Sequence, residues 1–191
     1  METRSWDERY RSGERAAEDI DAAPTSLLVE TSKRLTPGRA LDLACGSGRN
    51  ALWLAEQGWS VTAVDGSPAA IEILRSRASS RGVTVDMKVA DLEKFEYQIE
   101  PASWNLIAIC YYLQRDLFAP AMQGVVPGGI LISIVHITEP EEEPTAHRLR
   151  PGELERYFQG WEILHRREGK PHDAAHQRSV AEIVARRPAD S

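Results

Sequence analysis

The stretch Leu41-Asp42-Leu43-Ala44-Cys45-Gly46-Ser47-Gly48-Arg49-Asn50 decides the fold of this chain. An apolar run leads into a glycine-rich turn, which is typical of a buried strand followed by a helix, and such a turn lets a ligand approach the backbone. A turn that holds a pyrophosphate does so through backbone N–H groups and the positive end of a helix. Asp42 would repel that anion, so the turn favours a ligand that carries a positive charge.

Strand-like and helix-like patterns alternate around this stretch. Together they predict an α/β fold with a Rossmann-like seven-stranded sheet, mostly parallel, and helices on both faces. About a dozen residues join the last two strands, too few for a helical crossover, so the last strand is expected to be antiparallel. We predict strands at 40–44, 60–65, 83–89, 105–110, 130–137, 161–166 and 179–186, and helices at 5–35, 50–57, 68–81, 116–123 and from 151 onward.

Length and composition predict one domain over residues 1–191, in which a helical segment at 1–36 covers the site. The net charge of −6 argues against unaided binding of nucleic acid. No apolar run is long enough to cross a bilayer, and the charged N-terminus lacks the apolar core of a secretory signal. Two cysteines give no disulfide framework, so we expect a reducing, cytoplasmic location. We also expect a monomer or homodimer that does not bind membranes.

Three carboxylates lie at or near the carboxyl ends of predicted strands, the edge where open α/β sheets bind ligands. Asp65 lies 19 residues after Gly46 (65 − 46), the spacing at which an acidic residue reaches a ribose diol. Asp91 could accept a hydrogen bond from an adenine amino group, and Asp42 could approach an ammonium directly or through water. S-adenosylmethionine carries both an ammonium and a sulfonium, which suits this arrangement. The alternative is a plain tight turn with aspartates that cap helices or face water.

These motifs resemble the class I S-adenosylmethionine-dependent methyltransferases, and the resemblance extends over nearly the whole chain. Three further segments are similar to the small branch that includes tellurite-resistance and thiopurine methyltransferases, which implies a small-molecule substrate. The motifs of the class are Leu41–Gly48, Val64-Asp65 and Ala90-Asp91-Leu92, and those of the branch are Trp6–Tyr10, Tyr111–Phe118 and Leu149–Leu154.

The resemblance implies S-adenosylmethionine as cofactor. Gly46 and Gly48 would pack against its methionine part, and Cys110 would reach the methionyl group through its backbone carbonyl, although its thiol is expected to be a small core group. Asp65 would bind the ribose. The implied cofactor-binding residues are Asp42, Ala44, Cys45, Gly46, Gly48, Asp65, Gly66, Ser67, Asp91, Leu92 and Cys110.

Candidate residues for the methyl acceptor lie in the N-terminal helix and after the fourth, fifth and sixth predicted strands. The N-terminal aromatics could instead anchor an amphipathic helix, and the tyrosines could pack at a rim. An anionic acceptor would favour the arginines, but Arg148 and Arg150 could instead pair with the acidic residues at 139–143. The candidates are Trp6, Tyr10, Tyr111, Tyr112, Arg115, Arg148, Arg150 and His176.

The histidines do not predict a metal site. His172 and His176 are spaced by four residues, but they fall in an expected hairpin loop and no third ligand is evident. His136 and His165 fall within predicted strands and are interpreted as structural.

Methyl transfer from a sulfonium is an in-line displacement that depends on alignment and on exclusion of water. No general base is identified, and a soft thiolate or oxyanion acceptor, which needs none, is favoured. Two alternatives stay open. The run Gly46–Ala51 also fits the dinucleotide pattern of an NAD(P)-dependent oxidoreductase, and the chain could be a catalytically silent module that binds S-adenosylmethionine.

Overall fold

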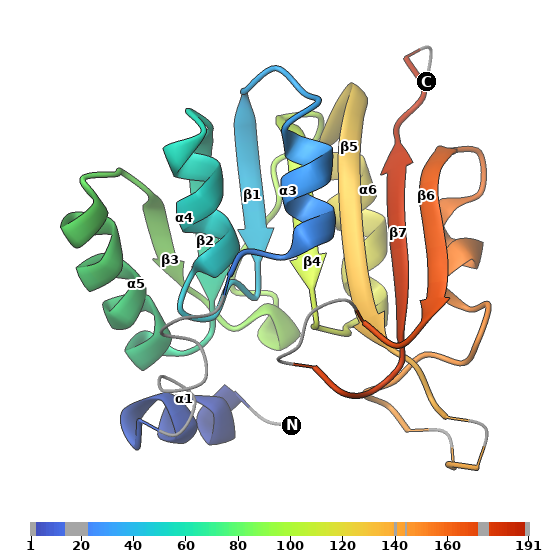
Figure 1. Ribbon diagram of the computed structural model, residues 1–191, viewed down its shortest axis with the longest axis horizontal. Helices are drawn as coiled ribbons and strands as arrows, with labels where there is room; N and C mark the ends of the chain where they lie inside the picture. The colour runs from blue at the N-terminus through green and yellow to red at the C-terminus, as the bar shows by residue number, and fades with distance from the viewer. Residues whose placement is uncertain (1–2, 14–22, 140, 144, 172–175, 190–191) are drawn as a thin grey trace. The chain divides into compact units, whose positions relative to one another are not determined.

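The chain carries a seven-stranded sheet with the strand order β3-β2-β1-β4-β5-β7-β6 (Figure 1). The computed structural model describes residues 3–13, 23–139, 141–143, 145–171 and 176–189. The pairs β1–β2, β2–β3 and β4–β5 are parallel, and β7 is antiparallel to both β5 and β6. The predicted fold class and the antiparallel last strand are therefore confirmed. The chain divides into two compact units, residues 1–98 and 99–191.

In the first unit, three parallel strands are covered by helices. The strands are β1 (Arg39–Leu43), β2 (Ser60–Asp65) and β3 (Asp86–Val89). Helix α4 (Arg49–Glu56) packs on β1 and β2, and α5 (Pro68–Arg81) packs on β2 and β3. Both β1 and β2 are almost continuously buried after their first residue, as expected for parallel strands that are covered on both faces.

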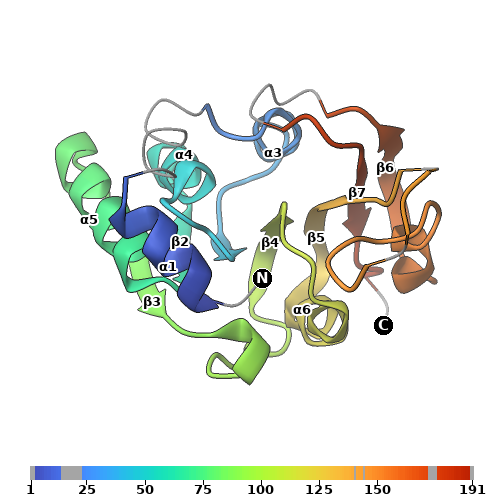
Figure 2. The same ribbon diagram turned by 90° about the horizontal axis from the view of Figure 1, so that it is seen from below.

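The N-terminal region is not the continuous helix that the sequence predicts over 5–35. Helix α1 (Thr3–Arg11) ends in a turn at Gly13, where φ is +77°, and α3 (Ser26–Ser32) is a separate short helix that packs on α4. Residues 14–22 lie outside the described part of the chain. Helix α1 packs against α5, across the ends toward which β1 and β2 point (Figures 1 and 2).

The second unit combines a parallel pair with an antiparallel one. Strands β4 (Trp104–Cys110) and β5 (Val125–His136) pair with each other, and β5 continues through β7 (Val180–Arg186) to the edge strand β6 (Glu162–Gly169). Helix α6 (Phe118–Gly124) packs on β4 and β5. Three 3₁₀ turns lie among the residues that the structure describes: η1 (Leu92–Lys94) in the first unit, and η2 (Arg115–Leu117) and η3 (Leu154–Phe158) in the second.

Three further predicted elements differ from the structure, two of them because backbone pairing with a neighbouring strand decides where a strand begins. Strand β3 begins at Asp86 rather than Val83, because its pairing with β2 begins opposite Thr62. Strand β5 already begins at Val125, since the glycines of the expected turn exchange backbone hydrogen bonds with Arg187 beyond β7. The helix expected from residue 151 is only the 3₁₀ turn η3.

None of the described helices combines the length and the apolar character that crossing a bilayer requires.

Candidate functional site

The glycine turn after β1 has, at two glycines, a left-handed backbone conformation that favours glycine. The φ angles of Gly46 and Gly48 are +56° and +85°. A Cβ on Gly48 would lie 2.1 Å from Cδ1 of Leu74 in α5, and a Cβ on Gly46 would lie 2.5 Å from the hydroxyl oxygen of Tyr10 in α1. Side chains of neighbouring helices therefore pack directly against both glycines. This close packing, as well as the sharp bend, disfavours any larger residue at these two positions.

Asp42 is buried in β1 behind this turn. The residue is 1% exposed, and its Oδ2 has no hydrogen-bond partner among the described residues. Burial raises the pKa of the carboxyl to about 7, and the charge of Asp65 adds to the rise, against a hydrogen bond from the backbone N–H of Ala51 and the charge of Arg49. A buried carboxylate with an unused oxygen is costly unless a cation offsets it.

Asp65 ties the ends of β1 and β2 together. Its Oδ2 accepts a hydrogen bond from the backbone N–H of Gly46 at 2.8 Å, and its Oδ1 accepts one from Ser67, also at 2.8 Å. Burial raises the pKa of Asp65, although these two N–H groups oppose the rise. Each carboxylate oxygen keeps a further lone pair, so Asp65 can still accept hydrogen bonds from a diol.

Two further predicted cofactor residues act as helix caps. Ser67 is fully buried, and its hydroxyl accepts a hydrogen bond from the backbone N–H of Ala70, as an N-cap of α5. Asp91 accepts a hydrogen bond from the backbone N–H of Glu93 at the start of η1, and its Oδ2 pairs with Lys94 at 2.9 Å. The capping alternative therefore holds for Asp91, while Ser67 begins α5 as its N-cap.

The remaining predicted residues of this unit follow β1, β2 and β3. Ala44 has a φ of +55°, and Leu92 is buried at the start of η1. Burial raises the pKa of the Cys45 thiol well above its ordinary value, so this cysteine is held as a neutral thiol. Gly66 links β2 to the cap of α5.

Helix α1 contributes an anchor that sequence reasoning missed. Oδ1 of Asp7 accepts hydrogen bonds from the Ser67 hydroxyl at 2.8 Å and from the backbone N–H of Ala69 at 3.0 Å. Burial opposes ionisation of Asp7, but these bonds and Arg11 lower its pKa overall. The only signal in the sequence is indirect: the first turn of α5 has no acidic residue of its own to complement its dipole.

The predicted N-terminal aromatics have different surroundings. Tyr10 is buried, with its hydroxyl against Gly46, whereas Trp6 is half-buried and lies under the guanidinium of Arg9, 4.9 Å from the ring centroid. Tyr10 is therefore the better placed of the two to cover the glycine turn.

In the second unit, Tyr111 and His176 come together although 65 residues separate them (176 − 111). Their rings stack with centroids 3.5 Å apart and planes 5° apart. Tyr111 follows Cys110 at the end of β4, and its φ of +61° is unusual for a non-glycine residue. The ring of His136, at the end of β5, lies 5.7 Å from that of Tyr111 and 5.4 Å from that of His176. His136 therefore belongs to this cluster, which its position within a predicted strand did not reveal.

Of the other histidines discussed above, His165 has a carboxylate partner and His172 is not described. His165 pairs with the buried carboxylate of Glu182 at 3.2 Å, beside the ion pair of Arg167 with the same carboxylate. His172 lies outside the described residues. Within the described ranges, no group of three or more His, Cys, Asp or Glu side chains is arranged to hold a metal ion.

The predicted arginines line a polar cavity of about 530 Å³. Arg115 forms an ion pair with Glu153, Arg148 pairs with Glu142, and Arg150 lies exposed beside them. The pairing alternative is therefore confirmed for Arg148. Tyr112 is not a lining residue, and its hydroxyl donates to the side chain of Gln114 at 2.8 Å.

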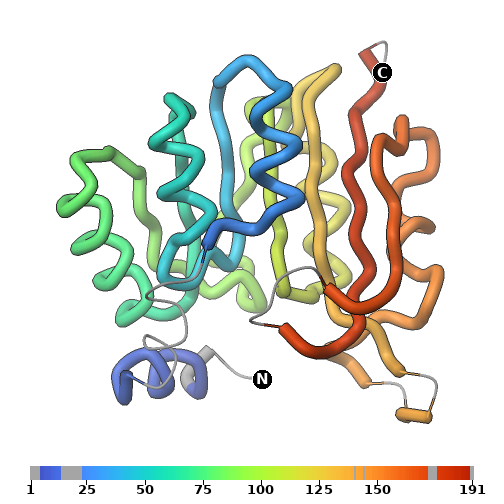
Figure 3. Tube along the Cα trace, viewed as in Figure 1, coloured from blue at the N-terminus to red at the C-terminus, as the bar shows by residue number. Residues whose placement is uncertain are grey.

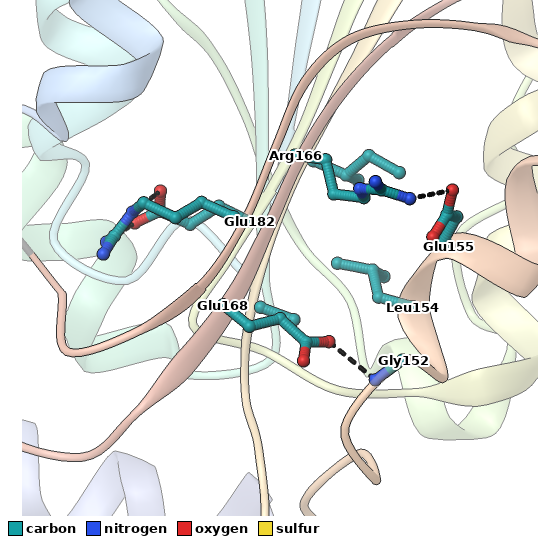
Figure 4. A pocket seen from close by; sticks show the side chains of 9 residues that line it. Gly152, Leu154, Glu155, Arg166, Glu168 and Glu182 are labelled. Atoms are coloured by element: carbon teal, nitrogen blue, oxygen red, sulfur yellow. Dashed lines mark hydrogen bonds and ion pairs between the residues drawn. The ribbon is translucent and has the colours of Figure 1, made fainter.

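A second cavity, of about 260 Å³, lies between η3, β6 and β7 (Figure 4). Its charged side chains satisfy one another. Arg166 pairs with Glu155, and Glu168 accepts a hydrogen bond from the backbone N–H of Gly152 at 2.7 Å. Two arginines and three carboxylates line this cavity, so it offers no excess positive charge.

Comparisons with known proteins support one family. A family model described as "Tellurite resistance protein TehB" matches residues 20–178. "Hemagglutinin 1" of Eikenella corrodens is 29% identical over 147 residues, which are 73% of this chain and 49% of that protein. The "Probable S-adenosyl-L-methionine-dependent methyltransferase TehB" of Haemophilus influenzae is 25% identical over 144 residues, 72% of this chain and 50% of that protein. The chain thus spans about half the length of these relatives.

Solved structures share the fold. The crystal structure of TehB from Haemophilus influenzae superposes with a TM-score of 0.72 at 23% identity, over 84% of this chain and 61% of that one. A Haemonchus contortus phosphoethanolamine N-methyltransferase, crystallised with S-adenosyl-L-methionine, gives a TM-score of 0.69 at 16% identity, over 87% and 54% of the two chains. With the family model covering most of its length, this chain belongs to the TehB tellurite-resistance protein family.

Proposed function

We propose that this chain binds S-adenosylmethionine at the glycine turn of its first unit and transfers the methyl group to a small-molecule acceptor. The observation that carries the proposal is the carboxylate of Asp42, which is buried behind the turn with an unpartnered oxygen. A diphosphate would be repelled there, whereas a cationic amino-acid nucleoside would offset the buried charge.

The residues around the turn fit the parts of such a cofactor. Asp42 would attract the ammonium, either directly or through a bridging water. Its carboxylate is buried, so this attraction would be only weakly screened by solvent. Asp65 would accept hydrogen bonds from the ribose hydroxyls with its remaining lone pairs, and Asp91 with Leu92 would hold the adenine. The remaining proposed contacts are Ala44, Cys45, Gly46, Gly48, Gly66, Ser67 and, through its carbonyl, Cys110.

When bound, S-adenosylmethionine supplies a methyl group on a sulfonium, so that in-line attack by the acceptor breaks the carbon–sulfur bond and leaves S-adenosylhomocysteine. The chain's own residues would bind, align and shield. Tyr10 lies buried over Gly46, where it excludes water from the turn, and Asp7 holds α1 in that place through Ser67 and Ala69. A thiolate or an oxyanion needs no general base, which agrees with the lack of an evident catalytic dyad in the sequence.

The relatives support this proposal. The Haemophilus influenzae TehB proteins are named as probable S-adenosyl-L-methionine-dependent methyltransferases. A "2-heptyl-1-hydroxyquinolin-4(1H)-one methyltransferase" of Mycobacteroides abscessus is 39% identical over 69 residues, which are 36% of this chain and 30% of that protein. Methyl transfer is thus common to these names; the TehB names give the methyl donor, and the Mycobacteroides name gives a small-molecule acceptor.

The acceptor would meet the residues that follow β4, β5 and β6. The stacked rings of Tyr111 and His176, with His136 beside them, form a polar aromatic cluster at the carboxyl ends of β4 and β5. In open α/β sheets ligands bind at these strand ends. The strained backbone of Tyr111 supports a functional role for its position.

Calorimetric titration of the full chain with S-adenosylmethionine, S-adenosylhomocysteine and NAD tests the cofactor assignment. We expect saturable binding of both sulfur compounds and no binding of NAD. Binding of NAD alone would refute the proposal in favour of an oxidoreductase.

A product screen with labelled S-adenosylmethionine tests the transfer itself. Thiols, oxyanions, phenols and amines would be offered, and mass spectrometry would detect the methylated product. We expect at least one labelled product among the thiols and oxyanions. Cofactor binding without any product from this panel would instead indicate a silent binding module.

A further inference from the structure

The cavity lined by the predicted arginines collects positive charge in a chain whose net charge is −6. Arginines make up four of its lining residues, and one carboxylate faces them, so the lining carries a formal charge of +3 (4 − 1). The second cavity of this unit has two arginines against three carboxylates. The lining residues with polar side chains are Arg115, Thr145, Arg148, Arg150, Glu153 and Arg156.

Arg115 lines this cavity, and its charge is largely neutralised by partners within the chain. Its Nε lies 2.8 Å from Oε1 of Glu153, and its two terminal nitrogens donate to the carbonyl oxygens of Ala146 and Arg148 at 2.9 and 3.0 Å. Burial opposes ionisation of Glu153, but Arg115, the backbone N–H of Arg150 and the charge of Arg150 lower its pKa overall. Arg115 therefore braces the loop at 145–153 and leaves the charge of this wall balanced.

Two of the other arginines hold no close ion pair. Arg148 pairs with Glu142, which also pairs with Arg178. For Arg150 and Arg156, by contrast, no carboxylate in the described part of the chain lies within ion-pair distance, and both residues are exposed at the cavity. Their guanidinium groups are the part of the lining that an incoming anion could engage, since guanidinium binds carboxylate and phosphate oxygens in a fork geometry.

The backbone fixes this cavity at the carboxyl ends of β4 and β5. Leu149 forms a bridge with Ile137 just beyond β5, and its N–H donates to the carbonyl of His136 at 3.0 Å, so Arg148 and Arg150 flank an anchored residue. The chain leaves β5 and enters β7 at this same edge of the second unit, where His136 lies opposite Val180 (Figure 3). This is the edge at which open α/β sheets bind their ligands.

We propose that this cavity binds an anionic group of the methyl acceptor, a carboxylate or a phosphate, through the guanidinium groups of Arg150 and Arg156. The inference rests on the proposed methyl transfer and adds the charge of the acceptor to it. It also separates two roles: Arg115 and Arg148 shape the cavity through their ion pairs, while Arg150 and Arg156 hold the ligand.

Titration of inorganic phosphate into the full chain at constant ionic strength tests the cavity without knowledge of the acceptor. We expect one saturable site in the wild type and dissociation constants that are about tenfold higher or more in Arg150→Gln and in Arg156→Gln, the scale of a lost charged hydrogen bond. Arg34→Gln is the matched control, because Arg34 is also exposed and has no ion pair within the described residues. Equal phosphate affinity in all four proteins would overturn the inference.

Pairs of acceptors that differ only in one carboxylate or phosphate group then distinguish an acceptor subsite from a site for free phosphate. The wild type should show a lower KM for the charged member, and Arg150→Gln and Arg156→Gln should erase this difference while Arg34→Gln keeps it. Phosphate binding without any such change in KM would overturn the acceptor assignment. Failure of the wild type to bind S-adenosylmethionine would instead overturn the proposed function, so the two failures can be told apart.

Discussion

The substitution Asp42→Asn should change both the affinity for S-adenosylmethionine and its dependence on pH. The carboxyl of Asp42 has a pKa of about 7 because it is buried. If the ammonium of the ligand requires the ionised form, then about a tenth of the sites are competent at pH 6 and about nine tenths at pH 8, which makes binding about tenfold weaker at pH 6, or about 1.4 kcal/mol. Asn cannot ionise, so the variant should lose this dependence.

Calorimetric titration at pH 6, 7 and 8 measures the effect. The α-amino group of the ligand titrates near 7.7–8.0, but it does so equally with both proteins, and the difference between wild type and variant therefore isolates Asp42. The wild type should also release a proton on binding at pH 6, which titrations in buffers of different ionisation enthalpy detect. Identical pH profiles for the two proteins would refute the role of Asp42.

The same substitution should stabilise the ligand-free chain at high pH. A carboxyl whose pKa is raised in the folded state binds more protons there than in the unfolded state, so stability falls as pH rises from the ordinary value of 3.8 to about 7. Relative to the acid limit this gap corresponds to about 4 kcal/mol at pH 8, of which about 2.6 kcal/mol is lost between pH 5 and pH 8. Urea unfolding at pH 5 and pH 8 should show a decline in the wild type that Asp42→Asn largely lacks. A wild type that is more stable at pH 8 than at pH 5, relative to the variant, would contradict this reasoning.

Other predictions follow from the contacts of the same unit. Gly48→Ala should lower the free energy of unfolding by about 2–4 kcal/mol, because the new Cβ meets Leu74 at a positive φ; unchanged urea unfolding would show that the turn can relax. Asp7→Asn should lower it by about 1 kcal/mol, the scale of a helix cap, and equal stability would mean that α1 does not anchor α5. Asp65→Ala should weaken S-adenosylmethionine binding by about 1–3 kcal/mol, and an unchanged dissociation constant in a folded variant would remove Asp65 from the ribose site.

The sequence predicted those parts of the fold that depend on local pattern. Strands β1, β2 and β4 are apolar runs, and α5 begins with Ser67-Pro68 and ends at Gly82, so their bounds agree closely with the prediction. The start of β5 was missed, because it depends on backbone hydrogen bonds that Gly128 donates to Arg187 and that Gly129 accepts from Arg187, about 60 residues further along the chain.

Some residues of the candidate site could likewise be predicted from local sequence, whereas others depend on contacts between distant parts of the chain. The carboxylates at the ends of β1 and β2 follow from spacing, and the structure brings Asp65 to the backbone of Gly46. Asp7 was missed because one carboxylate in a charged helix looks like any solvated charge until its partner helix is known. His136 was missed because the stack of Tyr111 on His176, which brings these rings to it, is a long-range contact.

A crystal structure of the full chain with S-adenosylmethionine tests the central claim most directly, namely that the acidic surroundings of the glycine turn receive a cationic nucleoside. We expect the ribose hydroxyls on the carboxylate of Asp65 and the ammonium on the side of the turn behind which Asp42 lies, with the Oδ2 of Asp42 engaged directly or through one water. A ligand bound elsewhere, with Oδ2 of Asp42 still unpartnered, would contradict the account.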